Sequence, residues 1–193
     1  KMRMPGLGGR TIEKLGATPV LLAGPDVLPS LASGAVDAAE WICPAADLGA
    51  GLYQAAKYYY GPGWHEPSTL LDLSIDLKAW ESLDSATQGL VINMTQSFNM
   101  TVFSRFQAIN GPALQKLTGE HGVTIKTFPD EVLIALGNAA GEVVSERGSI
   151  NSDTKAIANH LLSFRKVIKE WFTQGEQNFA RIRNLPFKFP DSV

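Results

Sequence analysis

Three side chains with the chemistry to bind an organic anion stand within the first 41 residues of the sequence. Arg3, in KMRMPGLGG, precedes a glycine-rich turn, and Glu40 and Trp41 stand side by side near the end of AVDAAEWI. Arginine binds a carboxylate better than lysine does, because its planar guanidinium can form two parallel charge-assisted hydrogen bonds. A glutamate oxygen can ligate a hard cation, and an indole can wall a pocket. If these three side chains meet, they suit a small organic acid.

Each of these residues also has a simpler interpretation. Taken alone, Arg3 is a surface arginine beside a tight turn, since the glycine spacing after it fits neither a dinucleotide fingerprint nor a phosphate loop. Neighbouring residues of a strand point to opposite faces, so Glu40 could be solvated while Trp41 belongs to the core. At a strand end this alternation relaxes, and both could then face one site. Residue by residue, the structural interpretation is the better one.

Two further reactive side chains have little support as functional groups. His65, in GWHEP, has no second histidine at metal-ligand spacing, so we expect a structural loop histidine. Cys43 has no nearby partner that could act as a base, so we expect a packed thiol. The sequence therefore predicts no catalytic residues. A hydrolase or lyase on an α/β lobe is the rival hypothesis, and it would rest on Glu40 alone.

Short alternating strands and helices must position these side chains. The first two helix patterns are closed by Gly16 and Gly34. Alternation over such short periods predicts an α/β fold with a parallel sheet covered on both faces. Ligands of such sheets bind at the carboxyl ends of the strands, where Arg3 and the pair Glu40–Trp41 fall. The predicted strands are KMRMP, ATPVLLAG and AVDAAEWI, and the predicted helices are GGRTIEKLG, PDVLPSLASG and PAADLGAGLYQAAKYY.

The middle of the sequence predicts a hinge followed by longer elements. The prolines and glycines of YYYGPGWHEP predict a loop or hinge. Residues 68–80, STLLDLSIDLKAW, alternate apolar and polar side chains, which predicts a half-buried strand long enough to bridge two lobes. Pro112 should kink or break the helix that follows. The remaining predicted elements are this helix, from about Ser85 with Leu90, Met94, Phe98 and Val102 at four-residue spacing, the strand VTIKTF and the helix PDEVLIALGNAAGEVVSERG.

A long helix is predicted from about Asp153 to Arg183. Its apolar residues recur mostly in steps of four and three, the pattern of a helix that packs along another helix. Gly175 interrupts the pattern, so a bend is expected there. Such a rod either spans both lobes or projects to a partner subunit, and a purely helical interaction module is a second rival hypothesis. The apolar positions are Ile157, Leu161, Phe164, Ile168, Trp171, Phe179 and Ile182.

Composition restricts the class of protein. The chain has 193 residues, of which 45% are hydrophobic and 19% charged, with a formal net charge of −2. These values are those of an ordinary globular protein, and the absence of a basic block argues against a nucleic-acid partner. No apolar run approaches the roughly 20 residues of a membrane span. The single cysteine excludes an internal disulfide framework but leaves the compartment open.

Three segments together resemble one protein family. KMRMPGLGG, LGATPVLLAGPDVLPSLASGAVDAAEW and GLYQAAKYYYGPGWHEP resemble the periplasmic solute-binding proteins of tripartite ATP-independent (TRAP) transporters, the DctP family. The best resemblance is to the branch that binds α-keto acids or is assigned to mannitol and chloroaromatic compounds. It is almost unbroken over residues 1–70 and looser to the end, the long C-terminal helix included. It implies a two-lobed, periplasmic binding protein-like α/β fold that closes on an organic acid and passes it to a membrane permease.

The resemblance also implies roles for the three residues. Arg3 matches the family arginine that salt-bridges the substrate carboxylate, and Trp41 matches the aromatic residue that contacts the ligand. Glu40 matches the glutamate that, with the backbone carbonyl of the tryptophan, helps to hold a cation bridging to the substrate. Sodium is the usual cation. The implied partners are a small carboxylate such as pyruvate and the TRAP permease. The apolar spacing of the C-terminal helix, rather than the resemblance, suggests a second copy of the chain as a further partner.

The sequence departs from the family pattern in two ways. Where relatives usually have a glycine, an aromatic residue and an asparagine, this chain has Cys43, Ala45 and Ala46, so polar or stacking contacts from that loop do not carry over. The chain also begins where the family is already in its second lobe. We therefore expect the first lobe and a secretory signal to lie upstream, with the mature protein in the periplasm.

Four segments follow from this resemblance. We expect residues 1–68 to form the ligand-binding α/β lobe and residues 69–128 to supply bridging strands and a long helix that returns to the other lobe. Residues 129–150 should form a helix packing on the lobes. Residues 151–193 should form the long C-terminal helix and a tail.

Overall fold

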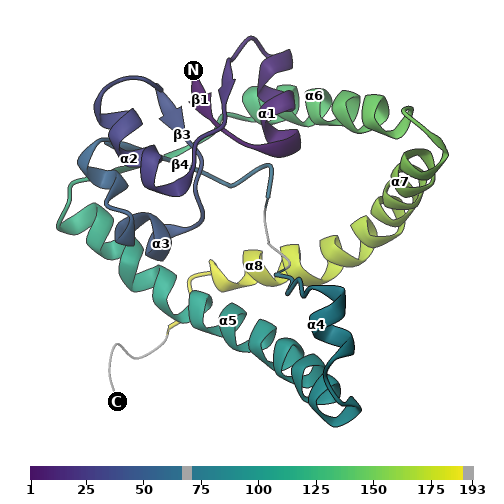
Figure 1. Ribbon diagram of the computed structural model, residues 1–193. Helices are drawn as coiled ribbons and strands as arrows, with labels where there is room; N and C mark the ends of the chain where they lie inside the picture. Colours follow the sequence, from purple (N-terminus) through teal and green to yellow (C-terminus); the bar gives the residue numbers. More distant parts are fainter. Residues whose placement is uncertain (67–70, 189–193) are drawn as a thin grey trace. The chain divides into compact units, whose positions relative to one another are not determined.

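The computed structural model describes residues 1–66 and 71–188 (Figure 1). Its backbone forms two compact units, the first spanning Lys1–Ala139 and the second beginning at Ala140. The first unit holds every strand of the described chain, and the second is helical. The candidate residues Arg3, Glu40 and Trp41 all lie in the first unit.

The first unit is organised around a parallel sheet of three very short strands. Strand β1 (Met2–Arg3) is central, between β2 (Pro19–Val20) and β3 (Ala38–Ala39). All pairings are parallel, and Arg3 is in register with Val20 on one side and with Ala39 on the other. The predicted parallel α/β arrangement is confirmed, although each strand is shorter than predicted. The central strand ends at Arg3.

The helices between these strands end just before the predicted glycines, although they begin at Gly6 and Gly24 rather than at the predicted Gly8 and Pro25. Helix α1 (Gly6–Lys14) and helix α2 (Gly24–Ala32) are followed by Gly16 and Gly34, which have φ angles of 88° and 73°. A left-handed backbone of this kind favours glycine, which explains why these residues stop the helices. Beneath them, a small core joins Met4, Ile12 and Leu136, with Met2 and Trp64 packed against it.

The segment after β3 differs from its prediction. One helix was expected over residues 44–59, but α3 (Pro44–Gly49) is short, a 3-10 turn follows at Leu52–Gln54, and the chain then forms strand β4 (Tyr58–Gly61). Gly51, with a φ of 71°, separates α3 from the 3-10 turn. The predicted loop at YYYGPGWHEP is therefore wrong in its first half. Strand β4 pairs in parallel with β5 (Thr124–Thr127), which the sequence had predicted as a strand.

The predicted bridging strand over residues 68–80 is also wrong, since residues 71–80 form no strand. Its first three residues lie outside the described residues, residues 71–76 are irregular, and helix α4 (Leu77–Glu81) follows. The Asp76 carboxylate accepts a hydrogen bond from the Ala79 amide at 3.0 Å and so begins this helix. The helix forms in place of the predicted strand because an alternating pattern makes a strand only where a neighbouring strand pairs with it, whereas the Asp76 cap needs no partner strand.

Helix α5 (Ser85–Gly119) runs through Pro112 without a break, so of the predicted kink or break the break is wrong. Residues on both sides of the proline are fixed by a hydrogen bond or by burial. Asn110 accepts a hydrogen bond from the Ala45 amide at the start of α3, and Ala113 and Leu117 are buried. These contacts hold the helix where the proline removes one backbone hydrogen bond. The predicted apolar face of the first half is largely exposed: Leu90, Met94 and Phe98 are each 61% exposed.

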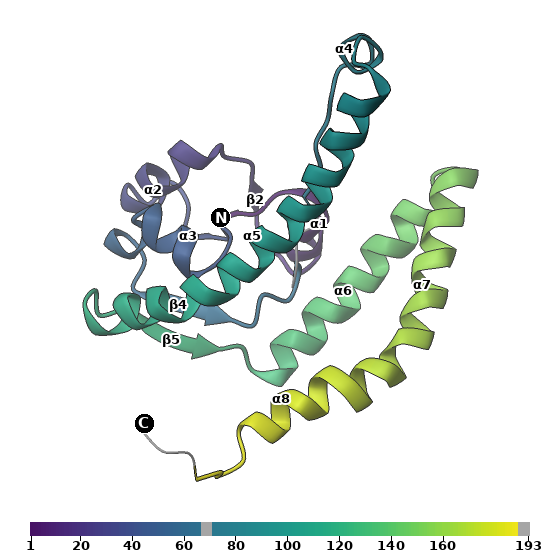
Figure 2. The same cartoon turned by 90° about the horizontal axis from the view of Figure 1, so that it is seen from below.

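The second unit contains the predicted long C-terminal helix. Helix α6 (Asp130–Gly148) leads into it from the first unit, and the helix itself comprises α7 (Ser152–Phe172), a π-helical turn over Thr173–Gln177 and α8 (Asn178–Arg183). This path is continuous and curves between α7 and α8 (Figure 2). Gly175, where a bend was expected, lies within the π-helical turn. Asn151 and Thr154 form a capping box at the start of α7.

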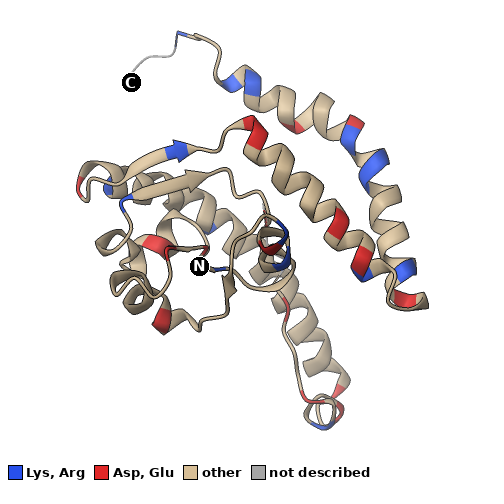
Figure 3. Ribbon diagram, turned by 90° about the horizontal axis from the view of Figure 1, so that it is seen from above, with Lys and Arg blue, Asp and Glu red and all other residues tan. Residues whose placement is uncertain are grey.

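Charge along the C-terminal helix is unevenly distributed. Residues 152–183 contain six lysines and arginines against three aspartates and glutamates, and the blue segments of the C-terminal helices in Figure 3 mark where the basic residues lie. No helix within the described ranges, 1–66 and 71–188, is both long and apolar enough to cross a membrane.

Candidate functional site

Parallel strand register brings Arg3 and Glu40 together. Arg3 ends the central strand β1, and Glu40 directly follows β3. The Glu40 amide donates a hydrogen bond to the Arg3 carbonyl at 3.0 Å, which continues the ladder one residue past the strand. Both side chains then lie at the carboxyl edge of the sheet, where such sheets bind ligands.

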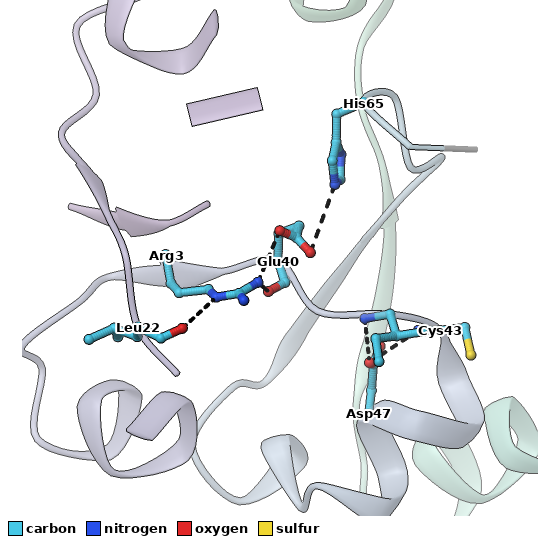
Figure 4. Close-up of polar contacts among 7 residues, drawn as sticks. Arg3, Leu22, Glu40, Cys43, Asp47 and His65 are labelled. Atoms are coloured by element: carbon cyan, nitrogen blue, oxygen red, sulfur yellow. Dashed lines mark hydrogen bonds and ion pairs between the residues drawn. The ribbon is translucent and has the colours of Figure 1, made fainter. Parts of the chain in front are cut away.

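The Arg3 guanidinium is held by three acceptors (Figure 4). Its Nη1 donates to the Glu40 carbonyl at 2.9 Å and to Glu40 Oε2 at 3.1 Å, and its Nε donates to the Leu22 carbonyl at 3.4 Å. The side chains of Arg3 and Glu40 are only 11% and 10% exposed. A charged pair this poorly exposed is costly to separate, because either charge left without its partner would be buried and uncompensated.

Trp41 lies beside this pair. The Arg3 Cζ atom lies over the indole at 5.1 Å from the ring centroid, which is the geometry of a cation–π contact. The structure thus brings together the three residues singled out in the sequence, a guanidinium, a carboxylate and an indole, at one edge of one sheet. Their roles toward a ligand remain proposals.

Burial is the main influence on the pKa of the Glu40 carboxyl. Burial raises the pKa of Glu40 above its ordinary value of 4.5, the carboxylates of Glu66 and Asp47 raise it further, and the Arg3 guanidinium opposes them. One arginine therefore does not compensate the desolvation of this carboxyl.

His65 also reaches the site, which the sequence analysis did not predict. Its Nε2 lies 4.0 Å from Glu40 Oε1 on the side of the carboxylate away from Arg3 (Figure 4). Burial lowers the pKa of His65 below its ordinary 6.5, although the Glu66 charge opposes this. Trp64, packed against the core, places the histidine there. In the sequence, the position of His65 is marked only by its neighbour Trp64, an apolar residue expected to pack inward. That neighbour does not indicate a contact between His65 and Glu40.

A buried aspartate shapes the loop that follows Trp41. Asp47, 6% exposed, accepts hydrogen bonds from the amides of Ile42 and Cys43 at 3.1 and 3.2 Å and from the Tyr59 hydroxyl. Burial raises the pKa of Asp47, and burial together with Asp47 raises the pKa of Tyr59 far above its usual range. The network fixes the backbone directly after the Glu40–Trp41 pair. Cys43 is half-buried and its thiol is free, and it takes part in this network through its backbone amide.

The oxygens available to a cation are few. In the described ranges no cluster of three or more His, Cys, Asp and Glu side chains could by itself hold a metal ion. A cation at Glu40 would therefore need backbone oxygen, such as the Trp41 carbonyl, and oxygens from a bound ligand. This requirement fits a hard cation with oxygen ligands better than a structural zinc site.

Fold and site together define an α/β solute-binding lobe whose polar groups gather at the carboxyl ends of parallel strands. The sequence of residues 1–149 matches the family described as bacterial extracellular solute-binding protein, family 7 (DctP). The chain belongs to this family of TRAP solute-binding proteins. The predicted fold class is confirmed, since the structural neighbours are TRAP periplasmic binding proteins with the two-lobed fold.

Three relatives illustrate the similarity. The monocarboxylate 2-oxoacid-binding periplasmic protein of Nostoc sp. (strain PCC 7120) is 35% identical over 183 residues, 93% of this chain and 50% of the relative. A TRAP solute-binding protein of Bordetella bronchiseptica RB50, a dimer described with calcium and picolinate, is 33% identical with a TM-score of 0.87 over 95% of this chain and 54% of the neighbour.

A third protein, from Pseudoalteromonas atlantica T6c, was solved with sodium and pyruvate. It is 29% identical with a TM-score of 0.87, over 97% of this chain and 56% of the neighbour. The chain thus spans about half the length of the proteins it resembles.

The raised pKa of Glu40 predicts how stability depends on pH. Because the folded-state pKa lies above the ordinary value of 4.5, the fold favours the protonated carboxyl. Relative to Glu40→Gln, the wild-type chain should lose stability as the pH rises from about 4 through the raised pKa, and the difference should then level off. Urea unfolding of both proteins between pH 4 and 8 measures this. A wild type that gains stability over the variant with rising pH would show that Arg3 outweighs burial.

Proposed function

We propose that this chain supplies the acid-binding site of an extracytoplasmic TRAP solute-binding protein that binds a small 2-oxo acid such as pyruvate, together with a bridging cation. The observation that carries the proposal is the convergence of Arg3, Glu40 and Trp41 at the sheet edge, with Arg3 Nη1 bonded to Glu40 and Arg3 Cζ lying 5.1 Å from the indole centroid. The proposed event is reversible binding, for which positioned charges suffice.

The ligands of the similar proteins share one chemical feature. Pyruvate carries a carbonyl oxygen, and picolinate a ring nitrogen, on the carbon next to the carboxylate. Either ligand can offer a cation two donor atoms at once, while its carboxylate also faces a guanidinium. Arg3 would hold the carboxylate by charge-assisted hydrogen bonds, and Trp41 would cover the apolar part of the acid.

The cation would be held by oxygen atoms at the opposite side of the ligand. In this proposal the Glu40 carboxylate and the Trp41 carbonyl ligate sodium or another hard cation. The carboxylates of Glu66 and Asp47, which add to the effect of burial on the pKa of Glu40, bring further negative charge near this position and so favour a cation there. A bound cation supplies positive charge that polarises both ligand oxygens and offsets the buried carboxylate.

The remaining parts of the proposal concern the whole protein. Residues 1–68 would form one wall of the binding cleft, residues 69–128 would connect to the other lobe, residues 129–150 would pack on the lobes, and residues 151–193 would form the long helix and tail. The protein would act in the periplasm and deliver its acid to the membrane permease of the transporter. The family membership and the half-length match to periplasmic relatives support this assignment.

Replacing the proposed carboxylate clamp should abolish tight binding. In the protein at its natural length, Arg3→Ala should weaken pyruvate binding by about 3 kcal/mol, roughly 100-fold, because two charged hydrogen bonds are lost. Isothermal titration calorimetry measures the change. Arg10→Ala, which removes an exposed arginine of α1, is the matched control and should bind as the wild type does. Equal affinity of Arg3→Ala and Arg10→Ala would refute the clamp.

Removing the cation should weaken binding through Glu40. Replacing sodium with a bulky organic cation and adding a chelator should lower the wild-type affinity for pyruvate at least tenfold, in line with the typical effect of losing a metal contact. Glu40→Ala should bind weakly in either buffer, while Glu13→Ala, an exposed change on α1, should respond to sodium like the wild type. If Glu40→Ala binds in sodium-free buffer as well as the wild type does with sodium, the bridging cation is wrong.

We also propose that the C-terminal helix joins two copies of the chain. Large apolar side chains are exposed along it, with Ile157 at 69%, Phe164 at 55% and Trp171 at 67%. Their spacing is that of a helix packed along another helix. The Bordetella neighbour is described as a dimer.

Shortening the chain tests this contact. Light scattering should give the mass of a dimer for the wild type and of a monomer for a chain that ends at Ser149. Ile157→Glu combined with Trp171→Glu, which keeps the helix but places charge on the apolar face, should also be monomeric. An unchanged mass in both variants would assign the dimer to another surface, and a monomeric wild type would end the proposal.

A further inference from the structure

Gly24, the first residue of helix α2, lies against the edge of the Trp41 indole. A Cβ atom placed on Gly24 would lie 2.8 Å from Trp41 Cη2 and 3.4 Å from Cζ2. The first of these distances is shorter than real Cβ contacts, so any side chain at position 24 must displace the ring. To reach ordinary contact at 3.4 Å, the indole edge would have to move by about 0.6 Å.

Backbone conformation does not explain this glycine. The glycines of the described chain that need a left-handed backbone are Gly6, Gly16, Gly34, Gly51 and Gly122, and Gly24 is not among them. An alanine would fit the backbone of α2 and would favour the helix. The space taken by the indole is therefore the reason that the structure gives for glycine at this position.

The same turn also holds Arg3. The Leu22 carbonyl, two residues before Gly24, accepts the hydrogen bond from Arg3 Nε at 3.4 Å. The turn from Leu22 to Gly24 thus contacts both the guanidinium and the indole, which lie 5.1 Å apart. Because the Arg3 guanidinium is held by the Leu22 carbonyl, an indole displaced at Gly24 would take a different position over Arg3.

We propose that Gly24 is a positioning residue for ligand binding: its missing side chain sets how the Trp41 indole lies over the Arg3 guanidinium and so fixes one wall of the acid site. This inference rests on the proposed function for its effect on affinity, and on geometry alone for the contact itself. A binding wall displaced by about half an ångström lies outside the tolerance of a preorganised site.

The experiment is a double-mutant cycle between positions 24 and 41. Gly24→Ala should weaken pyruvate binding at least tenfold in calorimetry. Phenylalanine lacks the outer ring that meets Gly24, so in the Trp41→Phe background the same change should cost less than twofold. Gly49→Ala is the matched control, because its Cβ meets nothing within 4 Å, and it should bind as the wild type does.

Two readouts that need no ligand accompany the cycle. Gly24→Ala should lower the Tm, and Trp41→Phe should remove most of that loss, which keeps the contact testable even if the single variant folds poorly. In NMR spectra, Gly24→Ala should shift the indole N–H signal of Trp41 and the Nε–H signal of Arg3, whereas Gly49→Ala should leave both in place.

The outcomes separate the two proposals. If the wild type binds no pyruvate with sodium or calcium present, the proposed function fails, while the Tm cycle and the NMR shifts still decide the role of Gly24. If the effects of Gly24→Ala are the same in both backgrounds, or if the Trp41 and Arg3 signals do not move, the positioning role is overturned.

Discussion

The ion pair between Arg3 and Glu40 is the interaction on which the rest of the site depends. It joins the central strand of the sheet to its neighbour, with Nη1 bonded to both oxygens that Glu40 presents, its carbonyl and its carboxylate. Burial nevertheless raises the Glu40 pKa despite the arginine. A buried pair of this kind contributes little net stability, since desolvation offsets the attraction. Under the proposed function, the pair serves ligand binding rather than folding.

Two supports hold the pair and its indole in place, and neither belongs to the sheet. On one side, the turn from Leu22 to Gly24 accepts the Arg3 Nε–H and leaves room for the Trp41 edge. On the other, Asp47 gathers two amides of the loop after Trp41 and the Tyr59 hydroxyl. Strands of two residues each give little rigidity of their own. The precision of the site therefore comes from these turns, whose polar groups are satisfied locally.

Features set by neighbouring residues could be predicted from the sequence, whereas features that depend on residues far along the chain could not. Helix stops at Gly16 and Gly34 depend on a single residue, and they were predicted correctly. Strand β4 was missed because its partner β5 lies more than 60 residues further along the chain. The apolar face of α5 was predicted, but such a pattern indicates that side chains such as Phe98 should be covered without indicating by what. His65 was assigned to a loop, and only the fold places it 4.0 Å from Glu40.

Under the proposed function, the charges of the site are completed by the ligand and the cation together. An acid bound between Arg3 and a cation at Glu40 gives an alternating series of positive, negative, positive and negative groups, in which each charge has an opposite neighbour on every side. A cation alone would stand close to the guanidinium, and an acid alone would stand close to the Glu40 carboxylate. Each therefore binds better in the presence of the other, and by linkage the coupling is equal in both directions. Selectivity for acids with a second donor atom beside the carboxylate then follows from the shared cation, because an acid without that donor leaves one ligand position on the cation unfilled.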